Sequence, residues 1–285
     1  MVKNPTEYLV GIEAWRVEKD YQMRAPGPGG WLAIVGMYPL RMGVNIVGSA
    51  EHSDVLLPVG SAPSQIGTVD YLDKCWILRV TTNETVTVDQ KPVRFAMLRT
   101  YGDIGGMSVV QVREVRFGIQ QWASDPINIR VWDANNPKRI NFPGRFWYPI
   151  DLRYRVKGKL KRYALARELT VEHTGGQTQE LHNIGVIEFE LMGTSFVFEA
   201  CEYVKGDGNV WLLMRDGTSG RLTYGAGRFL NVSVADDNSL DLDFNKLYHP
   251  PCAFFDFTTC PMPPRGNFIP FSVEAGEHYP QPVVV

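Results

Sequence analysis

Short segments rich in aromatic and β-branched residues recur along the chain, and this spacing restricts the fold more than any other feature. Glycine, proline and asparagine residues separate these segments, as expected for strands joined by tight turns. The predicted strands span residues 31–37, 45–49, 55–58, 75–80, 85–89, 115–119, 127–131, 186–191, 194–200, 210–215, 229–234 and 240–244. The pattern therefore predicts an all-β protein built from antiparallel sheets.

The chain has 285 residues, which is near the size at which one hydrophobic core stops growing, so we expect two domains. The segment at 122–126, Trp-Ala-Ser-Asp-Pro, is a plausible boundary. Residues 1–122 are predicted to form an N-terminal helix and a β-sandwich. Residues 123–285 are predicted to form a second β-barrel or β-sandwich that carries a functional site.

One helix is expected at the N-terminus. Asn4 can cap it, Pro5 suits the first helical position, and Glu7 can reach back to the amide of the cap. The apolar positions that follow at helical spacing are Leu9, Ile12 and Trp15. The polar positions expected to face water are Arg16, Glu18, Lys19 and Asp20. A proline- and glycine-rich run at residues 26–30 is expected to end the helix.

Composition excludes several classes of function. A formal charge of −2 and a pI near 6.2 argue against a nucleic-acid partner, and no apolar run approaches the roughly 20 residues that span a bilayer. The N-terminus lacks the apolar core of a secretory signal, and four cysteines do not make a disulfide scaffold, so we expect a cytoplasmic protein. No dinucleotide fingerprint or phosphate loop is present, so no cofactor is expected. The oligomeric state stays open.

Residues 215–278 combine turn-forming residues with polar side chains, an arrangement that suits a site. Within it, Tyr224 and Arg228 lie in the segment Thr-Tyr-Gly-Ala-Gly-Arg. The flanking glycines allow close approach of a ligand, and Arg228 offers a planar donor group to a carboxylate, phosphate or carbonyl. Tyr224 can donate a proton or a hydrogen bond. The alternative is a turn whose arginine pairs with a neighbouring aspartate.

Asp241, Asp243 and Asn245 lie two residues apart, which places them on one face if the strand continues through all three. We expect Asp243 to take part in catalysis and Asn245 to contact a substrate, and the alternative is a solvated outer face. The spacing resembles the start of a calcium loop, but Lys246 and Cys252 occupy the positions that need glycine and glutamate.

Three further residues complete the predicted site. Glu277 is a candidate general base or a partner for Arg228, and the alternative is an ordinary surface carboxylate. Asp216 and Thr218 are candidate substrate contacts, although their place in a tight turn favours local turn hydrogen bonds as the explanation. No metal site is predicted.

Cys252 and Cys260 lie on either side of a loop, and several interpretations remain open. They can form a disulfide, fill apolar gaps as buried thiols, or help bind zinc together with His249 and His278, although the spacing matches no usual zinc pattern. Cys252 can also act as a nucleophile, since His249 precedes it by three residues.

A set of short motifs runs through the second half of the chain. They are Arg-Val-Trp-Asp at 130–133, Phe-Pro-Gly at 142–144, Arg-Asp-Gly-Thr-Ser-Gly at 215–220, Thr-Tyr-Gly-Ala-Gly-Arg-Phe-Leu at 223–230, Asp-Phe-Asn at 243–245, Pro-Pro-Cys at 250–252, Cys-Pro at 260–261 and Ala-Gly-Glu at 275–277. Together they resemble the uncharacterised family domain of unknown function 1684, found in prokaryotes and fungi. Further pairs at 15–16, 31–32 and 48–49 extend the resemblance over nearly the whole chain. Leu222 and His249 depart from the residues common in that family.

The first half has a second resemblance. Gly-Ser at 48–49, Ser-Asp-Val-Leu-Leu-Pro at 53–58, Trp76 and Val-Asp-Gln-Lys-Pro-Val at 88–93 are similar to the forkhead-associated sandwich. Members of that family read phosphothreonine with an arginine and a Ser-Arg-x-His turn. Ser49 and the segment Ala-Pro-Ser-Gln at 62–65 stand there instead. The resemblance therefore predicts the fold without the phosphopeptide specificity.

These observations lead to two hypotheses about function. The first is a small-molecule site in the second domain, with Arg228 as anchor, acting as a cofactor-independent hydrolase, lyase, isomerase or cyclase on an anionic or carbonyl-bearing metabolite. The alternative is a non-catalytic protein-interaction module built on the sandwich, which predicts an exposed apolar patch there. A third interpretation treats every motif as turn chemistry.

Overall fold

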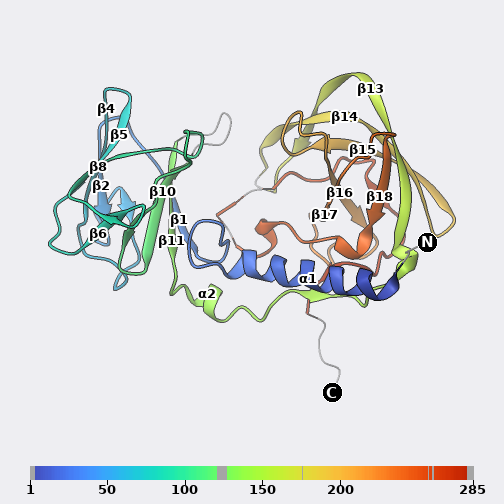
Figure 1. Cartoon of the computed structure of the whole chain (residues 1–285), viewed down its shortest axis with the longest axis horizontal. Helices are drawn as coiled ribbons and strands as arrows, with labels where there is room; N and C mark the ends of the chain where they lie inside the picture. Colours follow the sequence, from blue (N-terminus) through green and yellow to red (C-terminus); the bar gives the residue numbers. More distant parts are fainter. Residues whose placement is uncertain (1–3, 121–126, 175, 256, 259, 281–285) are drawn as a thin grey trace. The chain divides into compact units, whose positions relative to one another are not determined.

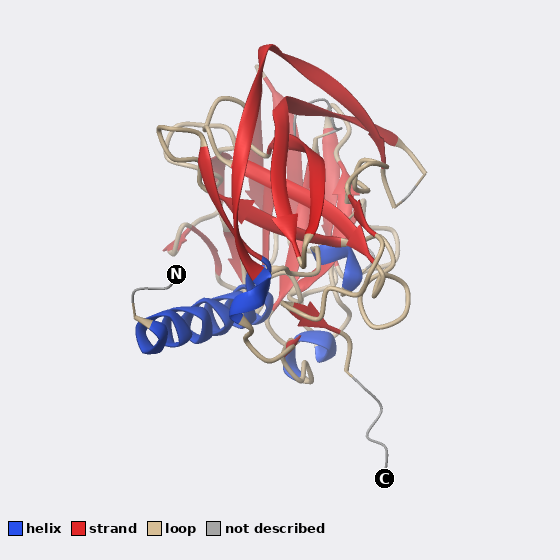
Figure 2. Cartoon of the chain, turned by 90° about the vertical axis from the view of Figure 1, so that its right-hand side faces the viewer, coloured by secondary structure: helices blue, strands red, loops and turns tan. Residues whose placement is uncertain are grey.

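The computed structural model describes residues 4–120, 127–174, 176–255, 257–258 and 260–280. Within these ranges the regular structure is mostly antiparallel β-sheet with one long helix, which confirms the predicted fold class (Figures 1 and 2). The chain divides into two compact units. One consists of Met1–Arg16 and Gly144–Val285 and is called the C-terminal unit below; the other, Val17–Pro143, is called the sandwich unit.

The sandwich unit contains two sheets. The six-stranded sheet has the order β1 (Ile34–Pro39), β11 (Asn128–Asp133), β10 (Val115–Gln120), β9 (Val110–Val112), β6 (Val86–Val88) and β7 (Lys91–Pro92). The five-stranded sheet has the order β3 (Val55–Leu56), β2 (Val44–Gly48), β4 (Gly67–Leu72), β5 (Cys75–Val80) and β8 (Phe95–Leu98). A short helix, α2 (Pro137–Ile140), follows the last strand.

One hydrophobic cluster joins these two sheets. Val47, Val69 and Leu78 from the five-stranded sheet pack with Phe117 and Val131 from the six-stranded sheet, and all five side chains are fully buried. Because alternate residues of each strand enter this shared layer, the unit is a β-sandwich, as the strand spacing predicts.

The C-terminal unit is organised around one large sheet. Its order is β17 (Arg228–Val232), β16 (Val210–Asp216), β15 (Thr194–Glu202), β14 (Thr178–Leu191), β13 (Arg155–Glu172) and β18 (Ser239–Asp243), and β19 (Phe268–Ile269) pairs in parallel with β16. A β-bridge between Val234 and Leu240 links the chain after β17 to β18, the strand at the other end of this order (Figure 1). The sheet therefore curves toward a barrel, and Ile187, Leu212 and Leu242 pack in its core.

Short elements below this sheet supply most of the polar residues of interest. Strand β12 (Phe146–Trp147) pairs with β20 (Glu277–His278), which brings the segment after Gly144 beside the end of the chain. Three 3₁₀ turns complete the unit, namely η1 (Leu152–Tyr154), η2 (Phe244–Lys246) and η3 (Pro251–Ala253).

Helix α1 (Pro5–Arg24) begins and ends where the sequence predicts. The side-chain oxygen of Asn4 accepts a hydrogen bond from the main-chain N–H of Glu7 at 3.3 Å, which satisfies one donor of the first turn. Ile12 is buried as expected, whereas Leu9 is 44% exposed and lies outside the apolar contact.

Arg16, expected to face water, is buried instead. Its guanidinium donates to the carbonyl of Tyr148 at 2.9 Å and lies 5.2 Å from the ring centre of Trp147, while Trp15 packs edge-on against the same ring. Helical periodicity alone placed Arg16 on the solvated face. Its guanidinium instead donates to a carbonyl and lies against an aromatic ring, so burial leaves it with partners.

The domain boundary predicted between residues 122 and 123 lies outside the described residues. Strand β11, which follows it and was expected in the second domain, pairs with β1 and β10 inside the sandwich unit. The compact units instead divide at Arg16 and after Pro143. The N-terminal segment thus clusters with residues far away in sequence.

Candidate functional site

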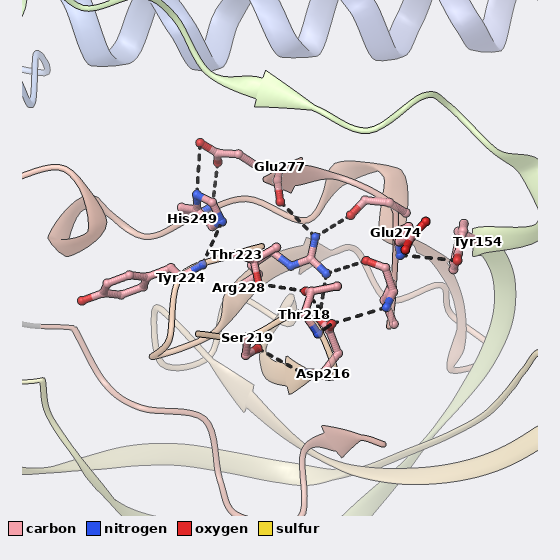
Figure 3. Close-up of polar contacts among 12 residues, drawn as sticks. Tyr154, Asp216, Thr218, Ser219, Thr223, Tyr224, Arg228, His249, Glu274 and Glu277 are labelled. Atoms are coloured by element: carbon pink, nitrogen blue, oxygen red, sulfur yellow. Dashed lines mark hydrogen bonds and ion pairs between the residues drawn. The ribbon is translucent and has the colours of Figure 1, made fainter. Parts of the chain in front are cut away.

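Arg228 points into the C-terminal unit from β17 and is completely buried. Its Nη2 donates to Asp216 at 2.7 Å and to the carbonyl of Val273 at 2.8 Å (Figure 3). Its Nη1 donates to the carbonyls of Ala275 at 2.5 Å and Glu277 at 3.0 Å. The arginine therefore ties the segment before β20 to the sheet, and the ion pair compensates for the removal of both charges from water.

Asp216 and Thr218 belong to the same buried cluster. The Asp216 carboxylate accepts hydrogen bonds from the main-chain N–H of Thr218 at 2.7 Å and from its hydroxyl at 2.6 Å. The Thr218 hydroxyl in turn lies 2.9 Å from that of Thr223. Asp216 thus closes a local turn on one side and neutralises Arg228 on the other.

The glycines around Tyr224 have unequal roles. Gly227 has a φ of +100°, and a β-carbon there would lie 2.4 Å from the main-chain oxygen of Met214. At Gly225 a β-carbon would meet nothing closer than 3.6 Å. The sequence pattern suggested that these glycines serve ligand access, whereas for Gly227 the close approach of β16 is a sufficient reason.

Glu277 carries its buried side chain toward Arg145 and His249 rather than toward Arg228. Arg145 forms an ion pair with one carboxylate oxygen, which also accepts the main-chain N–H of His249 at 2.7 Å. Although burial raises the pKa of Glu277, the charge of Arg145 and the hydrogen bonds from His249 bring it below its usual value, so the carboxylate is ionised at neutral pH. The predicted pairing with Arg228 is wrong for the side chain, because only the Glu277 carbonyl contacts that arginine.

His249 connects this ion pair to Tyr224. Its Nδ1 lies 3.5 Å from Glu277, and its Nε2 accepts the main-chain N–H of Tyr224 at 3.3 Å (Figure 3). Burial lowers the pKa of His249, so the ring is neutral, with the proton on Nδ1. Both ring nitrogens therefore have partners, and the histidine fixes the backbone that carries Tyr224.

The Tyr224 side chain points away from the Arg228 guanidinium (Figure 3). The side chains of Cys260, Tyr224 and Thr174 all influence the pKa of the Cys252 thiol. The hydrogen bond from Cys260 contributes most to lowering the pKa of the Cys252 thiol to about 7, against an opposing effect of burial. Cys252 is half-buried and Cys260 is buried, and neither forms a disulfide.

Aromatic side chains surround the same region. The rings of Tyr224, Phe254 and Tyr279 lie 6.5, 6.2 and 5.0 Å from the His249 ring, and all three are half-buried. The Arg145 guanidinium also covers the Phe254 ring at 4.8 Å. The Cys252 thiol thus lies beside an aromatic, partly exposed surface backed by buried charges.

Asp243 and Asn245 bond to a different part of the unit. Both oxygens of Asp243 lie 3.0 Å from the Tyr8 hydroxyl on α1, and Asn245 donates to that hydroxyl at 3.1 Å. Asn245 also exchanges hydrogen bonds with the main chain of Asp151 at 2.9 and 3.0 Å. These residues fasten the N-terminal helix to the sheet.

The predicted strand face does not extend to Asn245. Strand β18 ends at Asp243, whose side chain caps the turn η2 by accepting the main-chain N–H of Asn245 at 3.2 Å. Asp241 lies outside this group and pairs with Arg155 at 2.5 Å. The change from strand to 3₁₀ turn therefore ends the period of two.

The seven predicted site residues thus separate into three environments. Asp216, Thr218 and Arg228 form one buried cluster, Tyr224 and Glu277 lie on either side of His249, and Asp243 and Asn245 surround Tyr8. Their proposed roles in catalysis and substrate binding stay predictions. Five residues near the predicted site residues were not themselves predicted from the sequence, namely Tyr8, Arg145, Arg155, Thr174 and Tyr279. No short-range pattern marks them, because their partners are distant in sequence.

Among the described residues, no group of three or more histidine, cysteine, aspartate or glutamate side chains is arranged to hold a metal ion. In the part of the chain that the structure describes, no helix is both long and apolar enough to cross a membrane.

Several solved structures are similar to part of this chain. An uncharacterised protein of Haloarcula marismortui, solved by NMR, is 28% identical with a TM-score of 0.42, covering 49% of this chain and 78% of that one. The FhaA FHA domain, complexed with the intracellular domain of a partner, is 19% identical with a TM-score of 0.24, covering 33% of this chain and 85% of its own. An FHA domain studied for phosphothreonine-dependent interactions also has a TM-score of 0.24. It is 19% identical, and the match covers 33% of this chain and 81% of that domain. No ligand or partner of these proteins is transferred to this chain.

Comparison with protein families and curated proteins gives one match. No curated protein matches the chain. A family model described as "Protein of unknown function (DUF1684)" matches residues 140–278, just under half of the chain. The upstream residues that extended the predicted resemblance lie outside this segment. The resemblance to domain of unknown function 1684 is thereby confirmed for residues 140–278, which carry the sequence pattern of that family.

Proposed function

We propose that the C-terminal unit binds a small carbonyl-bearing molecule and acts on it without a cofactor, with the Cys252 thiol as nucleophile. The observation that carries the proposal is a half-buried thiol outside any disulfide, Cys252, whose pKa the Cys260, Tyr224 and Thr174 side chains lower. A thiolate is the reactive form of cysteine, and hydrogen bonds that stabilise it make a nucleophile available at neutral pH. The pKa of about 7 makes a large fraction of Cys252 thiolate under those conditions.

The proposed reaction begins when the Cys252 thiolate attacks the carbonyl carbon, forming a carbon–sulfur bond as the carbonyl electrons move to oxygen. Burial raises the pKa of Tyr224 well above its usual value, so its hydroxyl stays protonated and donates a hydrogen bond to that oxygen. Collapse of this tetrahedral intermediate expels the leaving group, which takes a proton from water, and leaves the acyl group on Cys252 as a thioester. A second water then hydrolyses the thioester. Among the hydrolase, lyase, isomerase and cyclase classes, this chemistry favours a hydrolase.

The other predicted residues take positioning roles in this proposal. Glu277 acts through His249 to hold the backbone of Tyr224, and Arg228 holds the segment that leads to Glu277. Asp216 and Thr218 orient Arg228 and its turn. Asp243 and Asn245 hold the N-terminal helix. Substrate contacts are then expected from the half-buried aromatic side chains beside Cys252.

The test uses p-nitrophenyl acetate as an acyl donor. We expect the reduced full-length protein to release one equivalent of p-nitrophenol rapidly and to carry the acetyl group on Cys252 by peptide mass spectrometry. Cys252→Ser should remove the fast phase, and Tyr224→Phe should slow it about tenfold, the effect of one hydrogen bond of about 1.4 kcal/mol.

Cys201 supplies the matched control for that experiment, because burial raises the pKa of its thiol to about 12. Cys201→Ser should therefore react like the wild-type protein. Acetylation spread evenly over the cysteines, or a fast phase that survives Cys252→Ser, would contradict the proposal.

A second candidate function rests on the sandwich unit. Strand β8 is the last strand of its sheet and carries Phe95 and Met97, which are 54% and 63% exposed. Val44, at 59% exposure, lies on the same face of the sheet but is separated from Met97 by Asp70 and the buried Ile77. An apolar edge strand favours pairing with another chain. This observation supports the non-catalytic interaction module as the alternative.

A photo-crosslinking experiment separates the two candidates. A crosslinker at Met97 should capture a protein partner in a complex that Phe95→Glu abolishes, whereas a crosslinker at the exposed Lys91 should not. Equal capture from both positions would remove the support for an interaction module. The acetylation of Cys252 is an independent measurement.

A further inference from the structure

Helix α1 carries apolar residues on two opposite faces. One face, which includes Ile12 and Met23, is buried in the protein. The opposite face also carries large apolar side chains, namely Val10, Val17 and Tyr21, which are 64%, 69% and 64% exposed. Packing inside the protein explains the first face, whereas the second face needs another explanation.

The exposed apolar residues form one continuous stripe. Together with Ala14, which is also exposed, they follow one another at intervals of four, three and four residues. Successive residues of a helix are turned by about 100°, so these intervals keep all four side chains on one side. These four residues are called the α1 stripe below. Alternating steps of three and four are the spacing with which one helix packs against another. Because α1 is a single uninterrupted helix (Figure 1), the stripe extends over about three turns.

Acidic side chains lie along both sides of the α1 stripe. The helical spacing places Glu7 and Glu18 on one side of it. Glu13 and Asp20 lie on the other side. All three glutamates are exposed. Glu18 accepts a hydrogen bond from the uncharged Gln22 at 3.1 Å, which leaves its negative charge in place.

The cations of the helix do not remove this negative charge. Arg16 forms an ion pair with Glu13 at 3.1 Å, yet the Glu13 side chain is 60% exposed and so can also meet a cation from solution. Arg24, at the end of the helix, donates to the carbonyl of Phe142 at 2.9 Å. The solvent side of α1 therefore combines an apolar stripe with acidic flanks.

From this surface we infer that α1 binds a basic amphipathic helix of a partner protein. The apolar face of that helix would cover the α1 stripe, and lysine or arginine residues on both of its flanks would meet the acids of α1. The inference goes beyond the proposed acyl transfer and concerns a different element from strand β8. It names the chemistry of the partner through charge complementarity.

A second copy of this chain is a poor partner for the same surface. In a packed helix pair, the residues that flank the apolar seam lie next to those of the other helix. A parallel pair of α1 helices would bring Glu13 close to Glu18, and an antiparallel pair would bring Glu13 close to Asp20. Both arrangements place like charges together, which is unfavourable. The same negative charge opposes binding to an anionic membrane surface.

The experiment uses the full-length protein and a labelled synthetic peptide of three heptads. The peptide has leucine at the two apolar positions of each heptad and lysine at both flanking positions, so that it does not pair with itself. Fluorescence anisotropy measures its dissociation constant, and we expect saturable binding that weakens as the salt concentration rises. Val17→Asp should raise the dissociation constant roughly tenfold or more, because it places a charge in the stripe. Glu18→Lys, which keeps the stripe, should raise it about threefold.

Two exposed positions outside α1 supply the matched controls. Val59→Asp repeats the apolar-to-acidic change, and Glu51→Lys repeats the charge reversal. Both variants should bind the peptide as the wild-type protein does. A peptide of the same composition, with its leucines out of register, should bind at least about tenfold more weakly because it has no apolar face.

Three outcomes would overturn the inference. The first is no change in anisotropy when the protein is added. The second is equal affinity for the out-of-register peptide, or equal affinity of the Val17→Asp protein. The third is a dimer in analytical ultracentrifugation that Val17→Asp dissociates, which would assign the α1 stripe to a second copy of this chain. Acetylation of Cys252 and crosslinking from Met97 are measured separately and depend on neither result.

Discussion

Individual charged residues in the C-terminal unit are buried as matched pairs. Arg228 pairs with Asp216, and Arg145 pairs with Glu277, so each guanidinium meets one carboxylate in surroundings that exclude water. The terminal nitrogens of Arg228 also donate to three main-chain carbonyls. Such pairs fix the geometry of neighbouring segments, and removing one partner leaves an uncompensated charge.

Glu277→Gln is therefore expected to reduce the free energy of unfolding by about 3–5 kcal/mol at pH 7, because Arg145 loses its counter-charge. The folded-state pKa of Glu277 is lowered, so its contribution is present above the unfolded value of about 4.5 and is lost as the pH falls through the lower folded value. Urea unfolding at several pH values between 7 and 3 measures both effects.

The exposed Glu274 provides the control for that measurement, since Glu274→Gln changes a carboxylate on the same segment. It should shift the free energy of unfolding by no more than about 0.5 kcal/mol. An acid-induced loss of stability that is equally steep in Glu277→Gln and the wild type would contradict the lowered pKa of Glu277 in the folded state.

Cys252 gives a second prediction at this scale. With a thiol pKa of about 7 rather than 9, its alkylation by iodoacetamide should reach half its maximal rate near pH 7. Tyr224→Phe removes one donor, so the midpoint should move to higher pH. Alkylation rates measured by peptide mass spectrometry between pH 5 and 10 test this, and a midpoint unmoved from about 8.5 would be inconsistent with it.

At the scale of elements, hydrogen bonds hold helix α1 against the turn at the end of β18. The Tyr8 hydroxyl lies between Asp243 and Asn245, and the Arg155 guanidinium covers its ring at 4.7 Å. Burial and the nearby Asp243 raise the pKa of Tyr8 well above its usual value. The Asp-Phe-Asn motif therefore has a structural explanation, the attachment of a helix more than two hundred residues away in sequence.

Tyr8→Phe should lower the free energy of unfolding by about 1–3 kcal/mol, because two buried polar groups lose a partner while the ring is kept. Tyr21→Phe is the matched control on the same helix, since Tyr21 is 64% exposed. Chemical denaturation followed by circular dichroism measures both variants. Equal stability of the two would show that the hydroxyl of Tyr8 contributes nothing.

At the scale of the whole molecule, the two compact units do not follow the order of the chain. The C-terminal unit takes its first sixteen residues from the N-terminus and the rest from residue 144 onward. The contacts of Tyr8 with Asp243 and of Trp15 with Trp147 explain why the first part of helix α1 belongs to the C-terminal unit. A division at residue 122 would separate these partners.

This discontinuity predicts complementation between fragments. A fragment of residues 144–285 should unfold at a higher temperature when a peptide of residues 1–24 is present in excess, since binding to the folded state stabilises it by mass action. A peptide carrying Tyr8→Phe should raise the midpoint less. Thermal unfolding followed by circular dichroism is the measurement, and a midpoint independent of the peptide would argue for a self-sufficient fragment.

Much of the fold could be predicted because it depends on local chemistry. Segments rich in aromatic and β-branched residues located most of the longer strands, and Asn4 with Pro5 marked the start of the helix. The site was less accessible to this reasoning. Tyr224 and Glu277 were selected, yet Arg145 and Tyr8 were not, because nothing near them in sequence indicates the partner that each contacts.

The sequence by itself determined the class of structure, since alternation, turns and caps act between residues a few positions apart. Only the tertiary structure decided the surroundings of each polar group. It turned Arg228 inward onto Asp216, attached Asn245 to the N-terminal helix, and placed Tyr224 and Glu277 on either side of His249. Burial and charge pairing depend on which distant segments contact each other. The closure of the sheet decides these contacts, and no local sequence pattern does.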